Sequence, residues 1–182
     1  MKLVSVLGGI LVALYPLLVF MGLSHDHGVW VFGLIFAVLC YRVVFSKAIT
    51  AMAKLLRFGA AIGVVLVALG MLLKQQHWFL YYPVAINLVL ATGFYISLRA
   101  KSPVITQLAL LQDPNLDERG RHYTATLTKL WLVFFVINAS IACATTFMSL
   151  NLWTLYNGLI SYLLIGTLLG GEWLYRKWVL KV

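Results

Sequence analysis

Charged side chains are scarce in this chain of 182 residues. Asp, Glu, Lys and Arg together make up 10% of it, whereas a soluble domain carries about 25%. Acidic side chains are the rarest, with five Asp and Glu against fourteen Lys and Arg. Because so few charges cannot cover a water-exposed surface, and because the mean hydropathy is +0.96, the composition excludes an ordinary soluble protein and indicates an integral membrane protein.

Other absences narrow the class further. The two cysteines, Cys40 and Cys143, fall at different depths of their predicted helices, so no disulfide is expected. No basic soluble segment exists that would make the net charge of +9 a sign of nucleic-acid binding. The apolar stretches carry no acidic or basic side chain at their centres, which disfavours a proton-coupled carrier.

Long uncharged stretches dominate what is there. A helix needs about 20 residues to cross a bilayer, and the uncharged run 130–171 is long enough for two helices joined at Ser149–Asn151. The sequence therefore predicts an all-α fold, a polytopic membrane helical bundle that forms a single domain over 1–182. Six transmembrane helices are predicted, at 3–23, 28–45, 58–73, 77–98, 130–149 and 152–171.

The basic residues predict the orientation of these helices. Lys and Arg accumulate in short cytoplasmic loops. If both termini lie inside, Lys74 is the one residue of the fourteen that falls outside, which predicts an N-in, C-in topology. The stretch 3–23 has features of a signal peptide. Its uncharged run is longer than the apolar core of a usual signal peptide, so we expect it to be retained as the first span.

The segment 42–57 has the pattern of a basic amphipathic helix. Its sequence is RVVFSKAITAMAKLLR, and at 100° per residue its basic side chains fall in one arc, opposite an apolar arc. Such a helix lies in the inner headgroup layer. It could recruit anionic lipid or an acidic protein, but we favour the simpler interpretation that it only fixes the orientation of its neighbours.

The cytoplasmic loop 99–129 is the longest polar segment. Three of the five acids lie in it: Asp113, Asp117 and Glu118. Ser102 is predicted to cap a short helix that ends at Gln112, and Asn115 to cap a second helix, with Glu118 completing a capping box. The acids therefore have a structural explanation as the start of the helix that leads into the fifth span.

A functional interpretation of the same loop stays open beside it. The docking or binding candidates are Asp117, Glu118, Arg119, Arg121, His122 and Tyr123. Arginines hold phosphates and carboxylates, and His122 with Glu118 could exchange protons. No nucleophile motif or metal spacing accompanies them, so no catalytic residue and no cofactor is predicted.

Polar residues near or within the spans form a second set of candidates: Asn87, Asn138, Asn157 and Glu172. Buried polar groups of this kind face the bundle, where they mark either a path through the membrane or a hydrogen-bonded contact between helices. On the outer side, His25, His27 and His77 are weak metal candidates, because their spacing matches no strong ligand signature. No metal is predicted.

Several motifs in the second half of the chain are shared with a known family. They are Ser102-Pro103-Val104-Ile105, Arg121-His122-Tyr123-Thr124, Trp131 with Phe134-Phe135 and Asn138, Trp153 with Tyr156-Asn157-Gly158, and Glu172-Trp173 with Arg176. The region 100–178 thereby resembles a poorly characterised family of small bacterial inner-membrane proteins. Genes of this family tend to lie beside ketosynthase, acyl-carrier-protein, dehydratase and acyltransferase genes in aryl-polyene and other fatty-acid-like clusters.

The resemblance implies a multi-pass protein of the bacterial inner (plasma) membrane and a pathway, but not an activity. The leading hypothesis is an accessory or scaffold protein for a cytoplasmic acyl or aryl-polyene lipid assembly pathway. Its partners would be the lipid bilayer and an acyl-carrier protein or synthase subunits, bound by 99–129 and 42–57. The alternatives are a lipid or small-molecule translocator that uses the three asparagines, and a membrane enzyme that acts on a lipid head group through His122. The oligomeric state is not predicted.

Overall fold

A computed structural model describes residues 14–24, 28–45 and 50–180. Within these ranges nearly every residue is helical and no strand occurs, so the predicted all-α class is confirmed. The helices are α2 (Tyr15–Ser24), α3 (Gly28–Phe45), α4 (Ala51–Leu72), α5 (Tyr82–Arg99), α6 (Val104–Gln112), α7 (Glu118–Thr145), α8 (Leu150–Leu155) and α9 (Ser161–Tyr175). A 3₁₀ segment, η1 (Gln76–Tyr81), precedes α5, and two π-helical segments, η2 (Tyr156–Ile160) and η3 (Arg176–Leu180), flank α9.

Four helical segments are long and apolar enough to cross a membrane. They are Ala51–Leu72, His77–Arg99, Glu118–Thr145 and Leu150–Trp178. Two shorter apolar helices, Tyr15–Ser24 and Trp30–Phe45, coincide with parts of the first two predicted spans. Most of the predicted span 3–23 precedes Tyr15, and residues 1–13 lie outside the described part of the chain.

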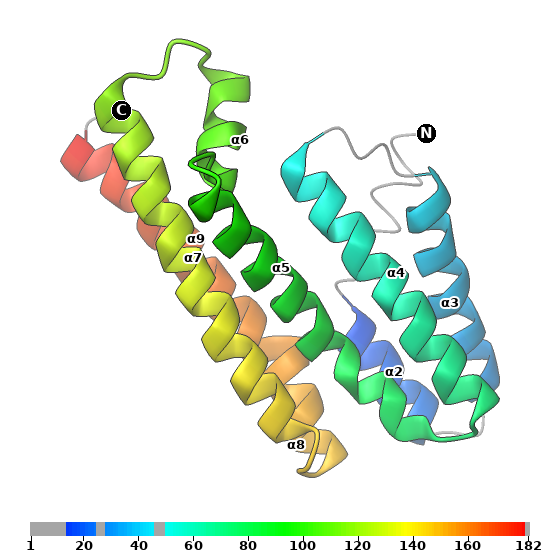
Figure 1. The fold of residues 1–182 in the computed structure, drawn as a ribbon. Coiled ribbons are helices and arrows are strands. Elements are labelled where there is room, and N and C mark those ends of the chain that lie inside the picture. Colours follow the sequence, from blue (N-terminus) through cyan, green and yellow to red (C-terminus); the bar gives the residue numbers. More distant parts are fainter. Residues whose placement is uncertain (1–13, 25–27, 46–49, 181–182) are drawn as a thin grey trace.

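The helices form two groups that lie side by side (Figure 1). The first group contains α2, α3 and α4, and the second contains α5, α7 and the helix that runs through α8 and α9. The contact between α5 and α7 is the most extensive in the described structure, and α4 joins the groups by packing against α5. Gly63 of α4 permits this approach, because a Cβ at this position would lie 2.6 Å from Tyr82 Cε2.

The predicted helix over 42–57 is not continuous. Thr50 has an extended backbone (φ −89°, ψ 158°), and its side chain accepts a hydrogen bond from Ala53 N at 3.1 Å. A threonine in this position is an N-cap, so α4 begins at Ala51, seven residues before the predicted start of the third span. The amphipathic pattern gives no sign of this cap. Residues 46–49 lie outside the described part of the chain.

The turn between the last two spans also lies earlier than predicted. α7 ends at Thr145, and Ser149 caps α8 by accepting a hydrogen bond from Leu152 N at 3.4 Å. The hydroxyl of Thr145 donates to Ala142 O, and Thr146 donates to Cys143 O. These side chains compete for carbonyls in the last helical turn, which favours an end to the helix at this point.

Two apolar clusters hold the groups together. One cluster joins α2, α3, α4, η1 and α8, and inside it Tyr15 donates a hydrogen bond to Phe79 O at 2.7 Å. In the same cluster, Trp153 Nε1 donates to Leu80 O at 3.1 Å, which satisfies the polar atom of a fully buried indole. The second cluster joins α5, α6 and α7 around Phe94 and Phe135.

Candidate functional site

The predicted cytoplasmic loop 99–129 folds as a helical hairpin, made by α6 and the first half of α7 (residues 104–131, the α6–α7 hairpin). The hydroxyls of Thr106 and Thr124 lie 2.8 Å apart, and both side chains are buried. Ile105 N donates to Thr128 Oγ1 at 3.4 Å, while Val104 packs against the Phe94–Phe135 cluster. The hydrogen bonds therefore hold α6 to α7, and the apolar contacts hold the hairpin to the bundle.

The predicted cap of α7 is wrong. Asp117 caps the helix, and its Oδ1 accepts a hydrogen bond from Gly120 N at 2.7 Å. Asn115 N donates instead to Asp113 Oδ1 at 3.0 Å. This Asx turn bends the chain around the proline that follows Asp113, so the next good cap, two residues after Asn115, starts the helix. The acids do lie at the helix start as predicted, with Asp117 as the cap and Glu118 in the first turn.

The predicted cap of α6 is wrong as well. Pro103 occupies the position before α6, and Ser102 makes no capping hydrogen bond with its side chain. The hydroxyl of Ser97, in the last turn of α5, accepts a hydrogen bond from Val104 N at 3.2 Å. The cap is thus supplied from the preceding helix, which a search for local capping motifs does not find.

The six candidate residues at the start of α7 do not converge on a point. Asp117, Glu118, Arg119, Arg121 and His122 are exposed, and Tyr123 is half-buried. Arg121 Nε donates to Leu116 O at 3.0 Å. Within the described residues the one ion pair, Glu172–Arg176, lies elsewhere. The arrangement is that of a charged surface, and it does not form the enclosed geometry of a catalytic centre.

Two of the predicted intramembrane asparagines meet in the core. Asn138 Nδ2 donates to Asn87 Oδ1 at 3.1 Å, and Tyr156 donates its hydroxyl hydrogen to Asn138 Oδ1 at 2.7 Å. Asn87 Nδ2 in turn donates to Pro83 O at 2.7 Å, and this is the last bond in the chain of hydrogen-bonded groups. This amide chain connects α5, α7 and η2 in a buried region, where an unpaired amide would be costly.

Asn157, the residue after Tyr156 in η2, makes a second contact with α7. Its Nδ2 donates to Thr145 Oγ1 at 3.1 Å and to Trp153 O at 2.9 Å. Sequence analysis did not single out Thr145, because a hydroxyl near a helix end gives no signal of a distant partner. Tyr156 was noted only in a motif of the resemblance.

Glu172, the fourth of these candidates, pairs with a residue of the α7 set. Tyr123 donates its hydroxyl hydrogen to Glu172 Oε1 at 3.3 Å, and Arg176 Nη1 lies 3.6 Å from the same oxygen. The rings of Tyr123 and Tyr175 are nearly parallel, with centroids 6.0 Å apart. Two positions far apart in the sequence are thereby brought together at the ends of α7 and α9.

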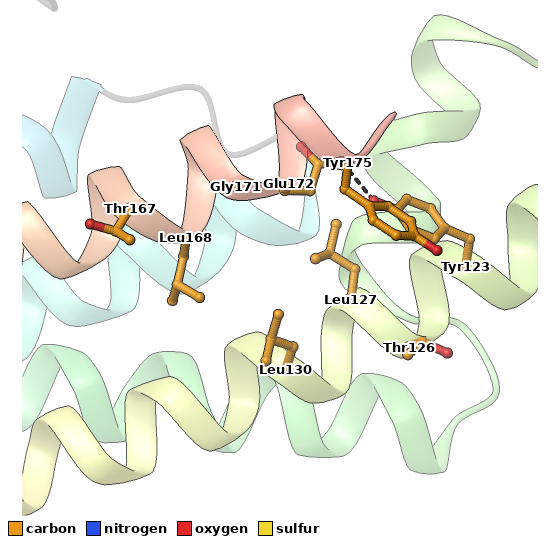
Figure 2. Close-up of a pocket in the computed structure, with 9 residues that line it drawn as sticks. All are labelled: Tyr123, Thr126, Leu127, Leu130, Thr167, Leu168, Gly171, Glu172 and Tyr175. Atoms are coloured by element: carbon orange, nitrogen blue, oxygen red, sulfur yellow. Dashed lines mark hydrogen bonds between the residues drawn. The ribbon is translucent and has the colours of Figure 1, made fainter. Parts of the chain in front are cut away.

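A groove runs between α7 and α9 from this polar contact (Figure 2). Its volume is about 370 Å³, within the range of small-molecule sites of about 300–1,000 Å³. Leu127 and Leu130 line it from α7, and Leu168 and Gly171 from α9. This α7–α9 groove is apolar along most of its length and ends at Glu172 and Tyr123 (Figure 2).

The weak metal candidates are not assembled in the described structure. His77 is exposed in η1, while His25 and His27 lie outside the described residues. Among the residues that are described, no three His, Cys, Asp or Glu side chains lie close enough to hold a metal ion.

No protein-family model, curated protein or solved structure matches this chain. Its class therefore follows from its own fold: it is an all-helical membrane protein, with four helical segments long and apolar enough to cross a bilayer.

Proposed function

We propose that this protein is a six-span accessory protein of the bacterial inner membrane, which docks components of a cytoplasmic acyl or aryl-polyene lipid assembly pathway on the α6–α7 hairpin. The single observation that carries the proposal is that the hairpin is folded yet leaves its charged side chains exposed and unpaired with one another. A fixed scaffold with exposed charges is suited to recognise a partner protein.

The charge distribution supports the orientation that the proposal needs. The hairpin and the end of α9 lie at one end of the molecule, and the connection between α4 and α5, which contains Lys74, lies at the other (Figure 1). Basic residues concentrate at the hairpin end, as cytoplasmic ends of spans do. We place this end in the cytoplasm, with both termini inside and with α2 and α3 in the first two spans.

One face of α7 is suited to hold an acidic partner. Arg119, His122 and Lys129 are exposed and are separated by three and seven residues, so they share one side of the helix. Leu111, 67% exposed at the end of α6, adds an apolar contact point. An acyl-carrier protein or a synthase subunit with an acidic surface would meet these groups, and salt would weaken the complex.

The two alternative functions receive less support from the contacts. A translocator would need polar side chains free to line a route, whereas the amides of Asn87, Asn138 and Asn157 are engaged in contacts between and within helices. A head-group enzyme would need a partner for His122. In the described part of the chain, no carboxylate forms an ion pair with this ring.

The test is co-purification from the native host after gentle solubilisation. We expect wild-type protein to retain a carrier protein or synthase subunit, and the double variant Arg119→Glu, Lys129→Glu to lose about tenfold of it. Lys74→Glu, a charge reversal at the opposite end, is the matched control and should retain the partner. Equal recovery with all three proteins, or equal loss in both variants, would contradict docking at the hairpin.

A further inference from the structure

The α7–α9 groove lies between two sets of contacts that α7 makes. Beyond the groove, Tyr156 and Asn157 of η2 bond to Asn138 and Thr145 of α7. At the polar end of the groove the hydroxyl of Tyr123 bonds to Glu172. A Cβ added at Gly171, which lines the groove, would meet no atom within 4 Å. The groove is thus open between these two sets of contacts.

The middle of the groove is mostly hydrocarbon. Leu127, Leu130 and Leu168 are apolar, and the hydroxyls of the two lining threonines are already used. Thr126 donates to a carbonyl of α7, His122 O, at 3.0 Å, and Thr167 donates to Leu163 O of α9 at 2.8 Å. Both threonines have therefore used their one hydroxyl hydrogen, so this part of the groove offers a ligand no donor, which suits an acyl chain.

The groove's polar end offers an acceptor. Tyr123 and Arg176 both contact Oε1 of Glu172, whose side chain is 18% exposed. Within the described structure Oε2 accepts no hydrogen bond, and it is not among the fully buried polar atoms. An ionised carboxylate only accepts hydrogen bonds, so this atom suits a donor such as a hydroxyl or ammonium group.

From these observations we propose that the α7–α9 groove binds one lipid molecule, with an acyl chain along the groove and a hydrogen-bond-donating head group at Glu172. A lipid fits both parts of this groove, because its acyl chain suits the apolar lining and its head group can donate a hydrogen bond to Oε2 of Glu172. An acyl chain is narrow and flexible enough to enter. The site does not depend on the docking function.

Native mass spectrometry of the purified full-length protein tests this site, with a monoacylglycerol as the probe. Its head group donates hydrogen bonds through two hydroxyls, and the methyl ester of the same fatty acid is the matched probe without donors. We expect one saturable monoacylglycerol per protein and about tenfold weaker binding of the methyl ester.

Two neighbouring glycines provide the matched variants. Gly171→Leu places a side chain in the groove, and we expect it to weaken monoacylglycerol binding about tenfold. Gly170→Leu enters equally open space without lining the groove, so its binding should stay within about twofold of wild type. Leu127→Trp fills the groove from α7, and it replaces Gly171→Leu in the comparison if that variant does not fold.

The opposite results would overturn the proposal. Equal binding by the Gly170 variant and a groove-filled variant would place the lipid elsewhere. Binding of several lipids without saturation would show only a general lipid coat. Equal affinity for the monoacylglycerol and the methyl ester would show that Glu172 does not bind the head group. A dimer that Gly171→Leu disrupts and Gly170→Leu preserves would assign the groove to a second copy of this chain.

Discussion

Asn138 occupies the central position in the amide chain, because it both donates to Asn87 and accepts from Tyr156. Each of these partners belongs to a different helical element. No water is available in the bilayer core to replace a lost hydrogen-bond partner. The unfolded state in the membrane also forms some hydrogen bonds, which reduces the net effect. The residue therefore stabilises the association of α5, α7 and η2.

The substitution Asn138→Leu should lower the free energy of unfolding by about 1–2 kcal/mol, because it leaves the Tyr156 hydroxyl and Asn87 Oδ1 without their partner. Denaturant titration in mixed micelles measures this. Ser140→Ala, an exposed change on the same helix, is the control and should have an effect below about 0.5 kcal/mol. Adding Asn87→Leu should cost less than the sum of the single changes, and strict additivity would contradict a direct contact.

Sequence could identify the asparagines but not their pairing. Asn87 and Asn138 stand out because amides are rare in apolar stretches. Which of them meet depends on the rotation of α5 against α7, and this is set by packing over the whole interface. The predicted cap of α7 was wrong for a related reason. Asn115 and Asp117 are both good cap residues, and the Asx turn at Asp113 decides between them.

At the scale of helices, glycines have opposite surroundings in α4 and α9. A Cβ at Gly63 would lie 2.6 Å from Tyr82 Cε2, whereas one at Gly166 would meet no atom within 4 Å. Gly63 thus permits close contact between α4 and α5, while α9 presents an open face. Gly59-Ala-Ala-Ile-Gly63 and Gly166-Thr-Leu-Leu-Gly170 both have small residues four positions apart, a pattern that lets helices approach closely, so the sequence does not distinguish the two cases.

We expect Gly63→Ala to destabilise the protein by about 1–3 kcal/mol, because the added methyl group overlaps Tyr82. Gly166→Ala should leave stability unchanged or raise it by up to about 1 kcal/mol, since alanine is the better helix former. Thermal unfolding in one detergent, monitored by circular dichroism, compares the two variants. A larger loss for Gly166→Ala would mean that α9 packs against a surface and is not open.

The helices themselves were predictable where apolar runs were long, as in α5 and α7. α6 was predicted because Asp113 and a proline end it. Its packing against α7 was not, because Thr106 and Thr124 look like ordinary polar residues of a loop until they are seen 2.8 Å apart. Sequence periodicity therefore located the element but not the surface that it buries.

The whole molecule has one predicted orientation, which cysteine labelling tests. In a background with Cys40→Ala and Cys143→Ala, a membrane-impermeant maleimide added to intact spheroplasts should label Lys74→Cys. Arg119→Cys should react only after the membrane is opened, because thirteen of the fourteen basic residues are assigned to the inner side. Labelling of Arg119→Cys in intact spheroplasts would show that the topology is the opposite of the predicted one and that the hairpin lies outside the cytoplasm.

The central claim is that cytoplasmic assembly proteins dock on the α6–α7 hairpin, and photo-crosslinking in living cells of the native host tests it most directly. A photoreactive amino acid would replace Leu111, 67% exposed on the hairpin, or Leu72, 79% exposed at the opposite end. The account predicts an adduct with a carrier protein or synthase subunit from position 111 and none from position 72. Equal adducts at both positions, or none at position 111 with normal protein level, would contradict it.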